Sequence, residues 1–242
     1  MPIVAPRLLL IVPAAIAFVA MALVVALVVS GPVGWLLGLL VGLAAGWVVM
    51  LVLERRAPGA ALRALGAQPL AAGAEPRFES LVESICASNG ISEPALYVVE
   101  SRAPDAAVAG NANDTRLVIT TGALRQLDRL ELEAVVAREL VQFGSGIHSA
   151  TILAAMGPFL GPFGEKLRTR LLDDRRLART DIDGVRLTRY PPALQAAFEK
   201  AATGGGVPDH PASRHLWLIG PMGVDGAVQP ALGERIDTLR EL

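Results

Sequence analysis

Cysteine and histidine are scarce in this chain of 242 residues, which contains one of the former and three of the latter. The single cysteine, Cys86, excludes an intrachain disulfide framework and a cysteine-rich zinc module. The three histidines, His148, His210 and His215, leave few imidazole ligands for any metal site. Charge of one sign is also lacking, with 22 Lys and Arg against 23 Asp and Glu. This balance excludes a general nucleic-acid binder, which needs a basic face.

Apolar residues are abundant, at 52% of the chain, and they are concentrated near the N-terminus. No charged residue lies between Arg7 and Glu54. A membrane-crossing helix needs about 20 predominantly apolar residues, so this run predicts two spans, at 8–29 and 33–53, broken at Ser30-Gly31-Pro32. A cleaved signal peptide is the competing interpretation of the first span. It is disfavoured because the apolar run is too long and no cleavage site stands out.

The positive charges around the hairpin (residues 1–56) predict its orientation. Arg7 precedes the first span, Arg55 and Arg56 follow the second, and the turn has no charge. Because positive residues favour the cytoplasmic side, we expect a multi-pass protein of the inner (plasma) membrane with both termini in the cytoplasm. The lipid bilayer is its expected first partner.

Glycines recur at about every fourth residue along the turn and the second span. Small residues at this spacing let membrane helices approach closely. Two interpretations stay open: packing within the hairpin, or a docking face for another integral membrane protein. The glycines concerned are Gly31, Gly34, Gly38, Gly42 and Gly46.

The remainder of the chain divides into a membrane-proximal connector at 57–74 and a cytoplasmic domain at 75–242. Helical spacing of apolar residues follows Glu75, and Asn89-Gly90 supplies a helix stop. Further β-rich runs occupy 95–100 and 116–121, with a short apolar stretch and a turn between them. We therefore predict an α+β fold, with a small sheet between helices.

A well-marked helix follows the second β-rich run. Asp128 and Glu131 match a capping box at its start. The helix runs from Leu130 to Phe143, and Gly144-Ser145-Gly146 ends it.

At this helix the sequence resembles the HtpX-like membrane metallopeptidases, relatives of the CAAX prenyl proteases. The resemblance implies a mainly helical, gluzincin-like metallopeptidase domain behind a transmembrane hairpin, with zinc as its cofactor. The segments that carry it appear in the family's order: Pro94–Gly110, Leu117–Leu140, Asp181–Ala202, Arg214–Pro221 and Gln229–Leu242.

The catalytic positions depart from the family pattern. In H-E-x-x-H, two histidines one turn apart bind zinc and the glutamate activates the metal-bound water. Here Arg138 and Gln142 stand at the histidine positions, and Glu139 keeps the place of the general base. The resemblance puts the third ligand at Leu177, which cannot bind metal, while the acidic Asp181 one turn later is retained. We expect no zinc, hence no cofactor, and a vestigial Glu139.

Two further departures concern the C-terminal end and the predicted sheet. The family's His-Pro-Pro reads Gln229-Pro230-Ala231 here. Its Asn-Ala-Phe edge-strand segment reads Asp105-Ala106-Ala107. Metallopeptidases of this kind add peptide substrate to a sheet edge. We expect that the backbone here can still pair with a peptide, but with a weaker side-chain anchor.

Arg138 has two possible environments. It shares a helix face with Gln142 and could meet Asp181, in which case an Arg138–Asp181 ion pair fills the space left by zinc. The alternative is that Arg138 points to solvent. Because Arg138 and Glu139 are adjacent, we do not expect these two side chains to face each other.

A third apolar stretch, Ile147–Phe163, is interrupted by Gly157-Pro158 and Gly161-Pro162. It is too short and too broken for a clear membrane span. We predict a buried or membrane-surface helical hairpin, with a re-entrant segment as the alternative.

These observations favour a catalytically inactive pseudopeptidase that serves as a membrane-anchored structural or accessory subunit, whose partner is another integral membrane protein or complex. One alternative is an active zinc endopeptidase in membrane protein quality control, with ligands recruited from His148, His215 or a partner chain. The other is an adaptor that binds peptides for a true protease.

Overall fold

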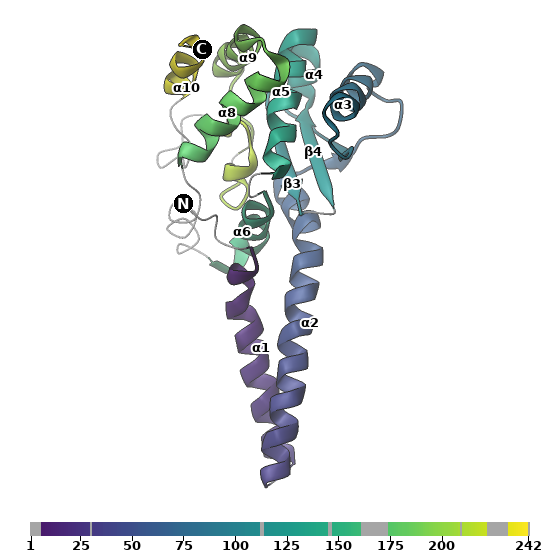
Figure 1. Cartoon of the computed structure of the whole chain (residues 1–242), viewed down its shortest axis with the longest axis vertical. Coiled ribbons are helices and arrows are strands. Elements are labelled where there is room, and N and C mark those ends of the chain that lie inside the picture. The colour runs from purple at the N-terminus through teal and green to yellow at the C-terminus, as the bar shows by residue number, and fades with distance from the viewer. Residues whose placement is uncertain are drawn as a thin grey trace. The chain divides into compact units, whose positions relative to one another are not determined.

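The computed structural model describes residues 6–29, 31–111, 114–144, 147–160, 174–208, 210–221 and 232–241. The chain divides into two compact units, 1–57 and 58–242. The fold is α+β, as predicted: two long N-terminal helices precede a mainly helical unit with one four-stranded sheet (Figure 1).

The N-terminal unit is a pair of helices, α1 (Pro6–Val28) and the first part of α2 (Pro32–Leu65). Both helices are long and apolar enough to cross a membrane. Gly31 turns the chain between them with φ +90°, a conformation that favours glycine.

The glycine row of α2 is used for packing within this hairpin. A Cβ on Gly38 would lie 2.6 Å from the carbonyl oxygen of Ala22, and a Cβ on Gly42 would lie 2.7 Å from that of Phe18. These separations are too short for a carbon atom, so the glycines permit α1 to approach α2. The intrahairpin interpretation is confirmed, and the same glycine face is not open to a second protein.

Helix α2 continues beyond the predicted span, through 57–65, where the sequence suggested a connector. Pro58 lies inside it, at the cost of one backbone hydrogen bond. The alanine-rich segment stays helical because its apolar side chains pack into the core of the second unit, where Ala61, Leu62 and Leu65 are buried. Tertiary packing thus overrides the local signal of Pro58.

The sheet of the second unit has the strand order β1-β2-β4-β3. β2 (Ala95–Val99) pairs in parallel with β4 (Thr115–Thr120), which confirms both predicted β-rich runs. β3 (Ala106–Gly110) pairs antiparallel with β4 and ends the sheet. β1 (Gln68–Pro69) is only two residues long and left no pattern in the sequence.

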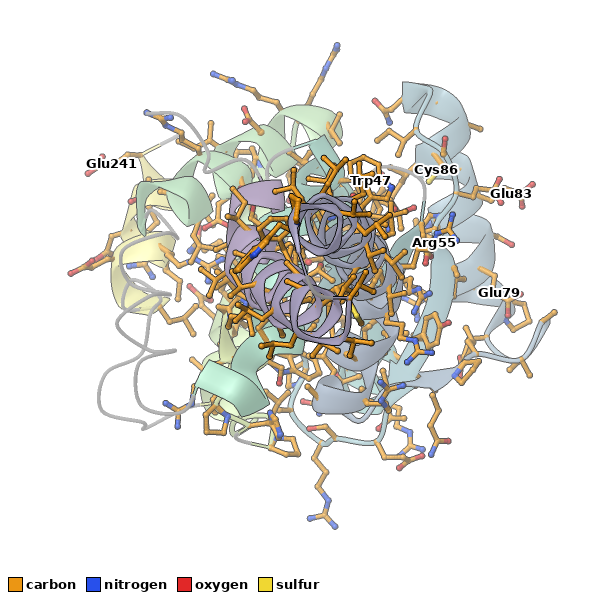
Figure 2. All side chains as sticks on the ribbon, turned by 90° about the horizontal axis from the view of Figure 1, so that it is seen from below. Trp47, Arg55, Glu79, Glu83, Cys86 and Glu241 are labelled. Atoms are coloured by element: carbon orange, nitrogen blue, oxygen red, sulfur yellow. The ribbon has the colours of Figure 1, made fainter. Side chains whose placement is uncertain are left out.

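Helix α3 (Pro76–Asn89) ends at Gly90, which has φ +64° and whose backbone N–H bonds to the carbonyl oxygen of Cys86. This is the stop predicted from Asn89-Gly90. Cys86 lies on the inner side of α3, while Glu83 projects from its outer side (Figure 2). Helix α4 (Thr121–Gln126) follows β4 and is capped by the Thr120 hydroxyl.

Helix α5 (Arg129–Val141) is the centre of the second unit (Figure 1). Its capping box is present in full: Asp128 accepts the N–H of Glu131, and Glu131 accepts the N–H of Asp128. α8 (Asp174–Thr188), α9 (Pro191–Thr203) and β3 pack around it. The short 3-10 helices η1 (Gln142–Gly144) and η2 (Arg214–Leu216) and helix α10 (Leu232–Arg240) complete the described elements.

Helix α6 (Ile147–Leu160) runs through Gly157-Pro158, where the sequence suggested a break. Gly157 serves close packing instead, since a Cβ there would lie 2.3 Å from the Cβ of Ala212. Most of the helix from Ile147 to Ala154 is buried, in agreement with the buried alternative for this arm. The second arm of the predicted hairpin, from Gly161 onward, lies outside the described residues.

Candidate functional site

Helix α5 carries three of the predicted site residues into the protein interior. Arg138 and Glu139 are fully buried, and Gln142 is almost so. The helix is buried on nearly every side because β3, α8 and α9 all pack against it. A permanently charged side chain in such a place requires partners of opposite charge.

Arg138 finds those partners on α8 and on its own helix. Its Nε atom donates to Oδ1 of Asp181 at 2.9 Å, and its Nη1 atom donates to Oε1 of Glu139 at 2.5 Å. The Arg138–Asp181 ion pair is therefore confirmed, and the solvent-facing interpretation of Arg138 is wrong.

The expectation that Arg138 and Glu139 do not face each other is also wrong. Their Cα–Cβ bonds diverge, as they do for adjacent helical residues, but the flexible arginine side chain is long enough to curl toward its neighbour. Burial removes water from both charged groups, so each of them needs a partner of opposite charge within the protein. Glu139 is also bonded from the other side, where Nε2 of Gln142 donates to its Oε2 atom at 2.9 Å.

Arg235 of α10 is the site residue that the sequence analysis missed. Its Nε and Nη2 atoms both donate to the Asp181 carboxylate, each at 2.8 Å, and its Nη1 atom donates to the carbonyl oxygen of Leu218 at 2.6 Å. The guanidinium carbon also lies 4.4 Å from the ring centre of Phe198. One signal could have found it: Arg235 shares the buried face of α10 with Ile236 and Leu239.

The name "charge cluster" is used below for Arg138, Glu139, Asp181 and Arg235. Its formal charges cancel. Burial alone would raise the pKa of Asp181, but the two guanidinium groups outweigh it and hold that pKa below its ordinary value. Burial raises the pKa of Glu139, and Arg138 offsets only part of this effect. The pKa of Arg138 is raised, because its two carboxylate partners outweigh the effect of burial.

Gly184 allows α8 to approach α5 closely enough to form the charge cluster. A Cβ at this position would lie 2.6 Å from both Cα and Cβ of Arg138. The glycine stands three residues after Asp181, on the next turn of the same helix. This residue had no visible role in the sequence, because a close helix crossing leaves no local pattern.

Leu177, the position of the family's third ligand, lies one turn before Asp181 on α8 and is half-buried. Its aliphatic side chain offers no donor atom to a metal. Gln229-Pro230-Ala231, at the family's His-Pro-Pro, lies outside the described residues.

Among the described residues, the histidines proposed as replacement ligands belong to no group that could hold a metal ion. His215 of η2 is buried, with its Nε2 atom 2.8 Å from the carbonyl oxygen of Ala150 on α6. That contact requires Nε2 to carry the proton, so this nitrogen is engaged with the backbone. His148 lies on α6, and His210 is exposed in the loop before η2.

The residues at this site do not fit zinc. A catalytic zinc ion needs three protein ligands with lone pairs directed at one point. Within the described part of the chain, no three His, Cys, Asp or Glu residues are grouped so that they could hold a metal ion. The two carboxylates that remain are both bonded to the Arg138 guanidinium, whose charge repels a cation.

The outer edge of β3, expected to remain available to a peptide, is contacted by the chain itself. The Leu218 N–H donates to the Ala106 carbonyl oxygen at 2.7 Å, and Ala107 forms an antiparallel bridge with Trp217. The Asp105 carboxylate accepts the N–H groups of Ile219 at 3.1 Å and Gly220 at 2.8 Å. The backbone at Ala106 and Ala107 is therefore already paired within the chain, while binding of a peptide at this edge stays a prediction.

Comparison with known proteins gives a consistent family. A protease HtpX homologue of Tropheryma whipplei (strain Twist) is 26% identical over 221 residues, which covers 73% of this chain and 76% of the relative. One of Paraburkholderia phytofirmans is 25% identical over 225 residues, 75% of this chain and 79% of the relative. One of Acidiphilium cryptum is 37% identical over 82 residues, 34% and 29% of the two chains. No protein-family model matches the chain.

Two apolar helices long enough to cross a membrane precede an α+β unit in which Glu139 lies on a buried helix. Protease HtpX homologues about 25% identical over most of the chain support an HtpX-like family.

Proposed function

We propose that this chain is a catalytically inactive HtpX-like protein that acts as a membrane-anchored structural or accessory subunit of a membrane protein complex. One observation carries the proposal: the fully buried Arg138 guanidinium is bonded to both Glu139 and Asp181. The resemblance implies that, in an active family member, the glutamate at the position of Glu139 activates a zinc-bound water. Here the same carboxylate accepts bonds from Arg138 and Gln142.

The charge cluster supports a structural role because its acidic groups already have cationic partners. Both oxygen atoms of the Glu139 carboxylate already accept hydrogen bonds, one from Arg138 and one from Gln142, and these bonds compete with any water for the same atoms. Arg138 cannot be deprotonated at physiological pH. We infer that the family's zinc cofactor is not used by this chain and that Glu139 is vestigial.

Membrane anchoring follows from the hairpin. We propose that both helices span the inner membrane, with the termini in the cytoplasm, as the positions of Arg7, Arg55 and Arg56 favour. Large apolar side chains on the outer faces of α1 and α2 are exposed, among them Trp35 and Trp47. These faces, rather than the glycine row, are available to lipid or to another integral membrane protein.

Two other functions are less well supported. An active zinc endopeptidase would need ligands from His148, His215 or a partner chain, and His215 is already bonded to α6. A peptide-binding adaptor would need the edge of β3, which residues of the same chain contact. The active endopeptidase is favoured by the names of the relatives, which are protease HtpX homologues.

Inactivity is tested by incubating the detergent-purified full-length chain and zinc with a fluorescently labelled unfolded protein such as casein. We expect no cleavage that depends on zinc. The proposal fails if a chelator stops a cleavage that the Glu139→Gln variant also lacks, because this pair of results identifies Glu139 as the base. Contaminating proteases are recognised by activity that survives in the variant.

The subunit role is tested by cross-linking in native membranes. A single partner recovered at fixed stoichiometry is expected of a subunit. A heterogeneous population of peptides would instead favour the adaptor.

A further inference from the structure

Two arginine side chains from distant parts of the sequence approach the same glycine. Arg63 lies one turn after Gly59 on α2, and Arg116 lies on β4. A Cβ on Gly59 would lie 4.0 Å from the Nη1 atom of Arg63 and 3.9 Å from that of Arg116. All three residues belong to the compact unit 58–242. The two guanidinium groups therefore converge at a helix position that carries no side chain.

Arg116 is held in this position by a carboxylate and an aromatic ring. Its Nε atom donates to Oδ1 of Asp114 at 2.9 Å, and its Nη2 atom donates to Oδ2 at 2.6 Å. The guanidinium carbon lies 5.9 Å from the ring centre of Tyr97. These hydrogen bonds use two of the three guanidinium nitrogens. The third nitrogen, Nη1, is the atom that approaches Gly59.

Positive charge is in excess beside Gly59. The carboxylate of Asp114 is already bonded to Arg116. Arg63 is exposed, and it has no ion pair or hydrogen bond with any residue that the structure describes. Two cations that approach one point repel each other, and an anion between them removes this cost. Because guanidinium N–H groups match the geometry of phosphate oxygens, the position suits a phosphate group.

The position of Gly59 along α2 indicates the source of such a phosphate. Gly59 follows the end of the predicted span, residue 53, by six residues of the same helix. A helix rises about 1.5 Å per residue, so this distance is about 9 Å. A bilayer has a polar headgroup layer of about 5–8 Å on each side of its hydrocarbon core. Helical side chains tilt toward the N-terminal end of their helix, which for Arg63 is the side of the predicted span. We therefore expect the two guanidinium groups at the boundary between headgroups and cytoplasm.

We propose that Gly59, Arg63 and Arg116 form a binding site for the phosphate group of an anionic phospholipid. Arg116 supplies a fixed N–H donor, Arg63 supplies a second donor from α2, and Gly59 leaves space for the phosphate between them. The site rests on the membrane anchoring proposed above, but not on catalytic inactivity. Extraction of membranes with alkaline carbonate separates the two proposals. Release of the chain refutes the anchoring, whereas a retained chain without preference for anionic lipid refutes the site alone.

Titration of the full-length chain in a neutral detergent tests the site. The probes are phosphatidylglycerol, phosphatidylcholine and glycerol 1-phosphate, and binding is measured by native mass spectrometry. Phosphatidylglycerol should bind at least about tenfold more tightly than the zwitterionic phosphatidylcholine. Equal affinity for the two lipids would overturn the proposal. Glycerol 1-phosphate that binds as tightly as phosphatidylglycerol would overturn the lipid as the source of the phosphate, because this probe has no acyl chains.

Variants of Arg63 separate a phosphate site from diffuse surface charge. Arg63→Gln should weaken the binding of phosphatidylglycerol about fivefold. Arg63→Lys keeps the charge but loses the paired N–H groups, so it should recover only part of this affinity. Arg77→Gln removes an exposed arginine of α3 and is the matched control, with wild-type affinity expected. Wild-type affinity of Arg63→Gln, or full recovery in Arg63→Lys, would overturn the proposal.

Gly59→Ala tests the space between the two guanidinium groups without removing a charge. The added methyl group would lie 3.9 Å and 4.0 Å from the two Nη1 atoms, and alanine is favoured over glycine within a helix. The melting temperature should therefore not fall. Because the methyl group occupies the proposed phosphate position, affinity for phosphatidylglycerol should be lost in a folded protein. Wild-type affinity of Gly59→Ala would contradict the placement of the phosphate at Gly59.

Discussion

Two buried aspartates in the cytoplasmic unit have the same exposure and opposite electrostatic environments. Asp181 and Asp105 are each 3% exposed. Asp181 is bonded to the guanidinium groups of Arg138 and Arg235, which hold its pKa below the ordinary value against the effect of burial. Asp105 accepts three backbone N–H bonds, from Ala106, Ile219 and Gly220, and burial raises its pKa to about 7.

The difference shows that the partner of a buried carboxylate, more than its burial, decides its ionisation. Around Asp181 the charges are matched, because two guanidinium groups face its carboxylate. Around Asp105 backbone dipoles counter burial only in part, and nearby Glu139 adds to the rise in pKa. We therefore expect the ionisation of Asp105, and not that of Asp181, to change near neutral pH.

The largest effect is expected from breaking the charge cluster. Arg138→Met leaves the buried Glu139 without its bonded cation and leaves Asp181 with Arg235 alone, and removal of one member of a buried pair costs about 3–5 kcal/mol. We expect a strong loss of thermal stability, or failure to accumulate. Arg186→Met is the control, because Arg186 forms an exposed pair with Asp183 and should change stability by less than about 1 kcal/mol. Unchanged stability of Asp181→Ala would also contradict the account.

The second prediction concerns the pH dependence of folding stability, in which Asp105 and Asp181 should have opposite effects. Because the folded pKa of Asp105 is raised from 3.8 to about 7, the folded state holds this proton more tightly than the unfolded state. Stability should therefore fall as the pH rises between about 4 and 7, by up to roughly 4 kcal/mol from this group. Asp105→Asn should flatten that slope in thermal unfolding from pH 4 to 8.

Asp181 should behave in the opposite way. Because the pKa of Asp181 is lowered in the folded state, the stability that this group contributes is fully present above the ordinary aspartate pKa. That stability is lost as the pH falls through the pKa of the folded state. Between pH 5 and 8 this group adds no slope. A slope that survives in Asp105→Asn would show that another group carries it.

A smaller effect is expected from Gly184→Ala. The added methyl group meets Arg138 at 2.6 Å, so α8 must move away from α5, and such overpacking costs about 1–3 kcal/mol. The pH slope from Asp105 should be unchanged, because its hydrogen-bond donors Ala106, Ile219 and Gly220 lie outside α5 and α8. A Gly184→Ala protein as stable as the wild type would contradict the close approach of the two helices.

The smallest effect is expected from Asp128→Ala, which removes the capping box of α5. Loss of an N-cap side chain costs about 1 kcal/mol. Since Asp128 lies at the far end of α5 from Arg138, the fall in melting temperature should leave the pH dependence of both aspartates as in the wild type. A changed pH profile would mean that the two regions are coupled through the helix.

Features with local causes were predictable from the sequence. The capping box of Asp128, the Gly90 stop and the strands β2 and β4 rest on short patterns, and the structure contains all of them. The Arg138–Asp181 pair was within reach because a buried arginine needs a carboxylate, and the resemblance aligned the two segments.

Features with distant causes were not predictable. Arg235 lies 54 residues from Asp181 in the sequence, and no local pattern around Arg235 predicts that Asp181 is its partner. Helix α2 passes Pro58 because Ala61 and Leu65 are buried by elements from elsewhere in the chain. The contact of Trp217–Gly220 with β3 was missed because it consists of one isolated bridge, one backbone bond and bonds to Asp105, which no strand pattern marks.

The most direct test of the central claim is the zinc content of the detergent-purified full-length protein, measured by elemental mass spectrometry after dialysis against a weak chelator. The variant with Arg138→His, Gln142→His and Leu177→Glu restores the family's ligands and serves as the reference. We expect wild-type protein to hold far less than one zinc ion per chain. Stoichiometric zinc that survives dialysis of the wild type would contradict the claim that Arg138 has closed this site.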